Sequence, residues 1–317
     1  MKIAFVGKGG AGKTTTSVLF AQFAAEKTKT VAIDADINMN LASELLDDKD
    51  FIKLSDKEIS QEIKQYLIGD NTRVKSPSHF RKSTPPARGS NLIDPLKQDD
   101  KFINKYLRPA AKNLAVGVIG TYSEDEIASS CYHNNLAIAE NIVSHAVNNQ
   151  SVICYDMVAG TDAFAGTLYA QFDLIIFVAE PTKKSVEVYK LYKKLAKNAG
   201  ISGALKVVVN KVSDSDDKEF IKSEIGNDII GFMGVSDHLK AVEKGRTRTD
   251  YRQLTPNDQS WLNNVWNELN YNFATTSDRD RLEKIWQAHK IYASQGYVVK
   301  AVGDLQNQID EGFNYEQ

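Results

Sequence analysis

The residues best suited to chemistry form one glycine-rich run near the start of the chain, Gly7-Lys8-Gly9-Gly10-Ala11-Gly12-Lys13-Thr14-Thr15. The run fits the phosphate-binding loop (P-loop) pattern G-x-x-x-x-G-K-T. Glycines let backbone N–H groups approach phosphate oxygens, Lys13 can reach the outer phosphates, and the Thr14 hydroxyl can ligate Mg²⁺. The residues expected to hold the phosphates are Gly9, Gly10, Ala11, Gly12, Lys13, Thr14 and Thr15.

Apolar segments on both sides position this loop. Residues 2–6 read as a short strand, and residues 14–26 place Val18, Leu19 and Phe20 on one face of a helix. A helix N-terminus directly after a glycine turn adds partial positive charge where an anion would sit. The alternative is a plain strand-to-helix turn without a ligand.

Six further apolar runs predict the other strands, at residues 30–34, 114–120, 151–156, 173–179, 205–211 and 228–233. Continuous apolar runs are typical of parallel strands buried on both faces. Because helical patterns separate the runs, the sequence predicts an α/β fold with a doubly wound, mostly parallel sheet. A ligand then binds at the carboxyl ends of the strands.

A second lysine, Lys8, makes the loop read K-G-G-x-G-K-T-T. This resembles the deviant P-loop of the MinD/ParA superfamily, and most closely its nickel-inserting branch, the maturation ATPases of carbon monoxide dehydrogenase. The resemblance implies ATP and Mg²⁺ as ligands and a homodimer on ATP binding. It also implies that Lys8 reaches the partner subunit's nucleotide and neutralises charge on the transferring phosphoryl group. The alternative is a solvated Lys8 in a flexible loop.

Polar residues after other strands extend the resemblance. The D-x-D pair that ends at Asp36 resembles the first switch, which implies that Asp36 lies near Mg²⁺ and orients the attacking water; otherwise the pair caps a helix. Asp156 resembles the Walker B carboxylate that holds Mg²⁺ through water. Gly160 lies in what looks like the second switch, where its N–H would reach the γ-phosphate. Asn210 and Lys211 resemble the base-binding position, where an amide can face adenine.

A cysteine and a histidine lie where the metal-inserting relatives carry a C-x-C pair. Cys131 and His133 could form a C-x-H site for Zn²⁺ or Ni²⁺ at the dimer interface, with two ligands from each subunit. In the other register Ser129 replaces the first cysteine and each subunit supplies one thiolate. A third reading makes Cys131 a small buried residue and His133 a polar group at a helix start.

The composition excludes several classes of protein. The 317 residues are 42% hydrophobic and 25% charged, with a net charge of -2, so binding nucleic acid through a general positive charge is not expected. No apolar run approaches the roughly 18 residues of a membrane span. The two cysteines, Cys131 and Cys154, form no disulfide framework and suit a reducing compartment. Since Met1 leads straight into the first strand, we expect a cytoplasmic protein.

The remaining segments are an insertion and an extension. We expect an ATPase domain at residues 1–246, with an insertion at about 46–112 that holds a helix at 55–67 and then irregular chain. Residues 247–317 should form a helical extension packed on the sheet, or a docking face for another protein. The irregular part of the insertion carries five basic residues and could be solvated or could meet nucleic acid, an acidic partner or a phosphate: Arg73, Lys75, Arg81, Lys82 and Arg88.

These patterns together favour a metalloenzyme-maturation or metal-delivery ATPase that acts on a client protein. The alternative is a positioning ATPase of ParA or MinD type that binds a protein partner, or DNA through basic patches such as residues 73–88. Salt dependence separates the two, because an affinity for DNA that rests on phosphate contacts falls steeply as the salt concentration rises.

Overall fold

The computed structural model describes residues 1–48, 50–121, 135–160, 164 and 166–315. In these residues eight strands form one sheet in the order β3-β4-β2-β5-β1-β6-β7-β8. Neighbouring strands are parallel except for the antiparallel pair of β3 and β4. The strands are β1 (Lys2–Gly7), β2 (Thr30–Ala35), β3 (Arg108–Ala111), β4 (Leu114–Val118), β5 (Val152–Met157), β6 (Leu174–Ala179), β7 (Leu205–Val212) and β8 (Ile229–Gly234).

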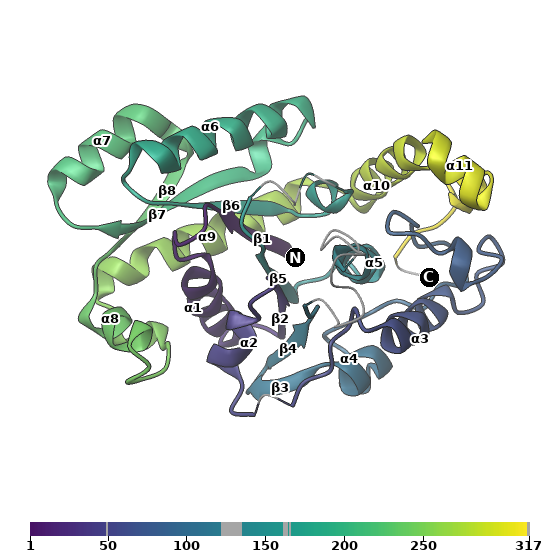
Figure 1. Cartoon of the computed structure of the whole chain (residues 1–317), viewed down its shortest axis with the longest axis horizontal. Coiled ribbons are helices and arrows are strands. Elements are labelled where there is room, and N and C mark those ends of the chain that lie inside the picture. The colour runs from purple at the N-terminus through teal and green to yellow at the C-terminus, as the bar shows by residue number, and fades with distance from the viewer. Residues whose placement is uncertain (49, 122–134, 161–163, 165, 316–317) are drawn as a thin grey trace.

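Helices cover both faces of the sheet (Figure 1). The core on one face is built with α1, α2 and α9, and the core on the other with α3 to α7. No helix in the described ranges is long and apolar enough to cross a membrane. The helices are α1 (Lys13–Ala25), α2 (Asn40–Leu45), α3 (Lys57–Ile68), α4 (Lys101–Tyr106), α5 (Leu136–His145), α6 (Lys183–Asn198), α7 (Ser215–Ile225), α8 (Asp237–Glu243), α9 (Pro256–Thr275), α10 (Asp278–Ala293) and α11 (Gly296–Val302).

The central strands are buried on both faces because successive residues enter opposite cores. On β1, Ile3 and Phe5 join the core that contains α1 and α9, whereas Ala4 and Val6 join the core that contains α5 and α6. All four are fully buried. This two-sided burial explains why the strands read as continuous apolar runs, and the predicted doubly wound, mostly parallel sheet is confirmed.

The insertion is more regular than the sequence predicted. The expected helix at 55–67 is α3, but α4 and the edge strand β3 were missed. β3 has only four residues, including Pro109, and it pairs with β4 alone. Proline lacks a backbone N–H donor and is therefore tolerated mainly in edge strands. The sequence Arg-Pro-Ala-Ala is also too short and too weakly apolar to be recognised as a strand.

The helices expected after residue 249 are present and their apolar faces are buried. Trp261 of α9 lies so close to β8 that a Cβ added to Gly231 would be 2.3 Å from the Trp261 Cβ. On α10, Leu282 and Trp286 pack against Phe313 and other apolar residues of the C-terminal segment. The helical spacing therefore marks a buried face on both helices, but α9 packs on the sheet whereas α10 packs on the C-terminal segment.

Two arginines of the basic segment bind an acidic residue in the same chain. The Arg88 Nε and Nη2 donate to the Asp310 carboxylate at 2.8 and 3.0 Å, and Arg73 Nη2 lies 3.4 Å from it. The Arg88 side chain contributes most to a pKa of about 2 for Asp310. Within the chain, Asp310 therefore offsets part of the charge of these two arginines, and an external partner for the basic segment stays a prediction.

We predict that Asp310→Asn lowers the free energy of unfolding by about 1–2 kcal/mol, because it removes charge-assisted hydrogen bonds that water partly screens. The Arg88 side chain is 61% exposed. Since the pKa of Asp310 is lower in the folded chain than the usual 3.9 or so, its contribution is present above about pH 4 and is lost as the pH falls toward 2.

Chemical denaturation of wild type and variant at pH 7 and pH 3 measures this difference. Glu311→Gln is the matched control, since Glu311 is an exposed neighbour. An equal loss at both pH values would show that the carboxylate charge is not what matters.

Candidate functional site

The P-loop connects β1 to α1 through glycines in left-handed conformation. Gly10 has φ 81° and Gly12 has φ 90°, and α1 begins directly afterwards at Lys13. A Cβ on Gly12 would lie 2.1 Å from the Asn210 Nδ2. The backbone conformation and the close approach both require glycine at position 12.

Lys13 points back into the loop rather than into solvent. Its side chain is buried, and the Nζ donates to the Lys8 carbonyl oxygen at 3.4 Å. Burial lowers the pKa of Lys13, while the nearby carboxylates of Asp156 and Asp36 oppose that shift. The loop therefore holds one desolvated cation beside two carboxylates, an arrangement suited to a polyanion accompanied by a metal ion.

Thr14 and Asp156 meet directly beneath the loop. The Thr14 hydroxyl donates to Asp156 Oδ2 at 2.6 Å, and Asp156 is fully buried. Burial raises the pKa of Asp156, and the neighbouring Asp34 raises it further. Among the described residues, Asp156 Oδ1 has no hydrogen-bond partner. A hydroxyl beside a carboxylate with a spare buried oxygen is a donor set that fits Mg²⁺.

The two aspartates of the D-x-D pair have different environments. Asp34 on β2 lies opposite Asp156 on β5 and accepts from the Ala42 N–H of α2 at 2.9 Å, and burial raises its pKa to about 7. Asp36 instead accepts from the backbone and side-chain N–H groups of Asn38, both at 2.9 Å. Asp34 thus binds an N–H at the N-terminus of α2, whereas Asp36 binds the turn that precedes this helix.

The segment after β5 contacts both the P-loop and α6. Gly9 lies beside Ala159, since a Cβ on Gly9 would be 3.8 Å from the Ala159 Cβ. Gly160 has φ 105°, and its carbonyl accepts a hydrogen bond from the Tyr192 hydroxyl of α6. Tyr192 also packs edge-to-face on Phe164. Tyr192 was missed because nothing in the pattern of α6 distinguishes it from a core residue.

Asn210 and Lys211, at the end of β7, support the P-loop from below. Asn210 Nδ2 donates to the Ala11 carbonyl at 2.9 Å, and Lys211 Nζ donates to the Gly10 carbonyl at 2.7 Å. Lys211 has φ 60°, a conformation that a non-glycine residue adopts only under local constraint. Contact with adenine remains a prediction for this pair, because both side chains here bind the loop itself.

Glu180 is a further residue of the site that the sequence analysis missed. It follows β6 and lies 3.8 Å from Lys8 and 2.9 Å from Lys211, measured between side-chain N and O atoms. Its position directly after the carboxyl end of β6 could have identified it, because ligands in this fold bind at that edge of the sheet.

The expected transition-metal ligands lie outside the described residues. Cys131 and His133, and Ser129 of the other register, all fall in the range 122–134. Among the described residues, no group of three or more His, Cys, Asp and Glu side chains could hold a metal ion. The other cysteine, Cys154, is fully buried on β5, and burial raises the pKa of its thiol well above the usual value. Cys154 is therefore an inert core residue.

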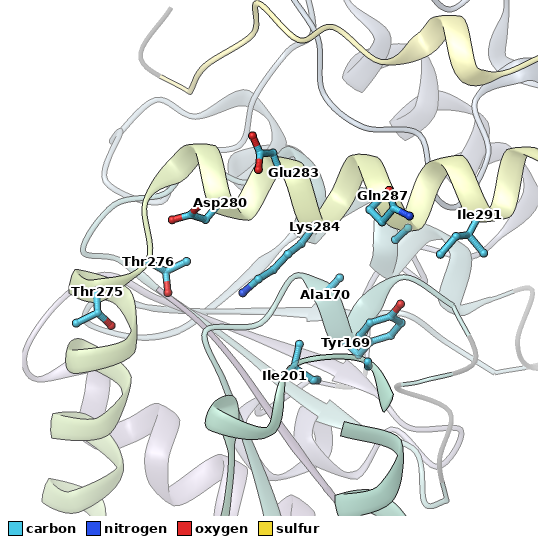
Figure 2. A pocket seen from close by; sticks show the side chains of 12 residues that line it. Tyr169, Ala170, Ile201, Thr275, Thr276, Asp280, Glu283, Lys284, Gln287 and Ile291 are labelled. Carbon is cyan, nitrogen blue, oxygen red and sulfur yellow. The ribbon is translucent and has the colours of Figure 1, made fainter. Parts of the chain in front are cut away.

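A cavity of about 620 Å³ lies away from the P-loop, between α10 and the short turn at Leu168–Ala170 (Figure 2). Lys284 extends into it from α10, and Tyr169 forms part of the opposite wall. Charged, polar and apolar residues all contribute to its lining. No residue of the P-loop lines this cavity, so the candidate site is the P-loop with its neighbouring carboxylates.

The fold and the site define a P-loop nucleotide-binding protein. Within that class, the family described as the CobQ/CobB/MinD/ParA nucleotide binding domain matches residues 3–248. The chain belongs to this family, which confirms the resemblance to the MinD/ParA superfamily; the closer likeness to its nickel-inserting branch stays a prediction.

Individual relatives agree with this family. The chain is 30% identical over 244 residues to an uncharacterised ATP-binding protein of Methanocaldococcus jannaschii, covering 75% of this chain and 87% of the relative. It is 24% identical over 247 residues to the carbon monoxide dehydrogenase accessory protein CooC of Rhodospirillum rubrum, covering 77% and 87%. A ParA family ATPase from Chlorobium tepidum has a similar fold, with a TM-score of 0.54 and 15% identity, covering 84% of this chain and 98% of that one.

We predict that Gly12→Ala lowers the free energy of unfolding by about 2–3 kcal/mol, because left-handed backbone disfavours alanine and the new methyl displaces Asn210 from Ala11. Gly10→Ala is the matched control. Its φ is also positive, but an added Cβ has no neighbour within 4 Å, so the loss should be about 1–2 kcal/mol. Chemical denaturation compares the two. Equal losses, or no relief when Asn210→Ala is added to Gly12→Ala, would contradict the steric explanation.

Proposed function

We propose that this protein is a Mg²⁺-dependent ATPase that works as a nucleotide-switched homodimer. The observation that carries the proposal is the Thr14–Asp156 hydrogen bond beneath the P-loop, with a spare carboxylate oxygen on Asp156. Thr14 and Asp156 would hold Mg²⁺, Asp156 through water. When bound, Mg²⁺ would neutralise charge on the phosphates.

Each remaining residue has a separate task. Lys13 leaves its contact with the Lys8 carbonyl and binds the phosphates, while the backbone of residues 9–15 cradles them. Asp36 positions the attacking water and accepts its proton. Gly160 offers its N–H to the γ-phosphate. Lys8 is supplied to the partner subunit's nucleotide, where it stabilises charge that develops on the transferring group.

The biological role we propose is maturation of a metalloenzyme or delivery of a metal to a client protein. The support is the similarity to CooC, whose name states that it is an accessory protein of carbon monoxide dehydrogenase. A positioning ATPase of ParA or MinD type is the alternative, since the fold fits both equally. Pairing of Arg73 and Arg88 with Asp310 reduces the positive charge that the basic segment offers to DNA. DNA affinity that falls steeply with salt would favour the alternative.

We expect three variants to separate binding, chemistry and assembly. Lys13→Ala should lose ATP binding because it removes the phosphate-binding cation. Asp36→Ala should bind ATP and hydrolyse it far more slowly. Lys8→Ala should bind ATP as a monomer with a rate lowered about 10³-fold or more, the scale of a charge supplied in trans. Equilibrium binding of labelled ATP and phosphate release at several protein concentrations measure all three.

Wild-type specific activity should rise with protein concentration if the active form is a dimer. Full turnover in Asp36→Ala would remove that carboxylate from the mechanism. A wild-type rate in Lys8→Ala, with specific activity independent of dilution, would show that hydrolysis occurs within one subunit.

For the metal, we propose that Cys131 and His133 of two subunits bind one Zn²⁺ or Ni²⁺ per dimer. Calorimetric titration of the ATP-bound dimer should give that stoichiometry, with affinity rising with pH as the thiol ionises. Binding lost in both Cys131→Ala and His133→Ala supports the C-x-H site, whereas loss in Cys131→Ala alone favours the single-thiolate register. Metal binding that survives Cys131→Ala overturns the site.

A further inference from the structure

Glu180 is held rigidly beside the P-loop by its position between β6 and α6. The pairing of β6 with β1 places Val178 opposite Gly7, so the residue that follows β6 emerges next to the loop that follows β1. The Glu180 N–H donates to the Ser185 hydroxyl at 3.0 Å, and the Glu180 carbonyl accepts from the Thr182 N–H at 2.7 Å. The side chain is only 16% exposed, so its direction is fixed toward the loop.

The two carboxylate oxygens of Glu180 face two different lysines. Oε1 accepts from Lys211 Nζ at 2.9 Å, and Lys211 Nζ is held a second time by the Gly10 carbonyl at 2.7 Å. Oε2 lies 3.8 Å from Lys8 Nζ, and the Lys8 side chain is 39% exposed. The Lys211 contact is thus a short, doubly anchored hydrogen bond, whereas the Lys8 contact is a longer ion pair that is easily released.

We propose that Glu180 is the counter-ion that keeps Lys8 on its own subunit, and that it thereby sets how readily ATP-bound subunits pair. The inference rests on the proposed function, because it requires Lys8 to act in trans. In the dimer Lys8 would leave Glu180 for the partner's nucleotide. Lys211 remains bonded to Glu180 when this happens, so the departure leaves no unpaired buried carboxylate. The second lysine is what makes the exchange of partners feasible.

The test is the dimer dissociation constant measured by sedimentation in Mg²⁺ and the non-hydrolysable analogue AMP-PNP. Glu180→Gln keeps the shape of the side chain and an acceptor for Lys211 but removes the charge that holds Lys8. A surface ion pair is worth a factor of up to about five, and a symmetric dimer releases two. We expect the dissociation constant to fall about fivefold to twentyfold at low salt, and less at high salt.

Two comparisons and one condition make the result specific. Glu219→Gln removes the same charge from an exposed site on α7 and should leave the dissociation constant unchanged. In a Lys8→Ala background, Glu180→Gln should have no further effect, because the contact is already absent. All dissociation constants are compared at saturating AMP-PNP, so that a change in the nucleotide affinity of Glu180→Gln does not enter the result.

A Glu180→Gln variant that dimerises no more tightly than wild type overturns the proposal. The proposal also fails if Glu180→Gln lowers the dissociation constant of the dimer in the Lys8→Ala background. If Glu180→Gln fails to fold, Glu180→Asp takes its place, since the shorter side chain keeps the charge but withdraws it from Lys8. Its expected effect is a dissociation constant about twofold to fivefold lower, the scale of a weakened surface pair. Wild-type dimerisation and turnover in Lys8→Ala would instead refute the action of Lys8 in trans, on which this inference rests, whatever Glu180 does.

Discussion

Two fully buried carboxylates, Asp34 and Asp156, lie opposite each other on adjacent central strands. Burying such groups without partners costs several kcal/mol each. The elements at this edge of the sheet supply the partners that both acids need. The N-terminus of α2 supplies the Ala42 amide to Asp34, and the first turn of α1 supplies the Thr14 hydroxyl to Asp156. Lys13 adds positive charge from the loop above. The arrangement of the site follows from where these two acids can be neutralised.

The P-loop likewise keeps its shape because its polar backbone groups receive hydrogen-bond partners. Its carbonyls at Gly10 and Ala11 are bound by the side chains of Lys211 and Asn210. Because a trans peptide directs its C=O and N–H to opposite sides, binding the Ala11 carbonyl from the sheet turns the Gly12 amide outward. A loop restrained in this way is prepared to receive an anion without reorganising.

Prediction from sequence succeeded where local pattern and burial agree. The strands around the P-loop are apolar runs because they are buried on both faces. The apolar residues of α9 and α10 show helical spacing because each helix buries one face, α9 against the sheet and α10 against the C-terminal segment. It failed where long-range contacts decide the outcome. The D-x-D motif does not reveal that Asp34, and not Asp36, accepts a hydrogen bond from α2. The sequence around Glu180 does not reveal that this residue pairs with Lys8 and Lys211. Likewise, β3 forms only because β4 is available to pair with it.

The pairing of Arg88 with Asp310 spans 222 residues and has a consequence for how the chain folds during synthesis. At the usual rate of about 5–20 residues per second, the ribosome needs roughly 10–40 s to travel from one partner to the other. Until then the insertion holds its arginines without the acid that binds them, although the P-loop and the strands beside it are already complete. The nucleotide site can thus assemble before the insertion gains the ion pair that ties it to the C-terminal segment.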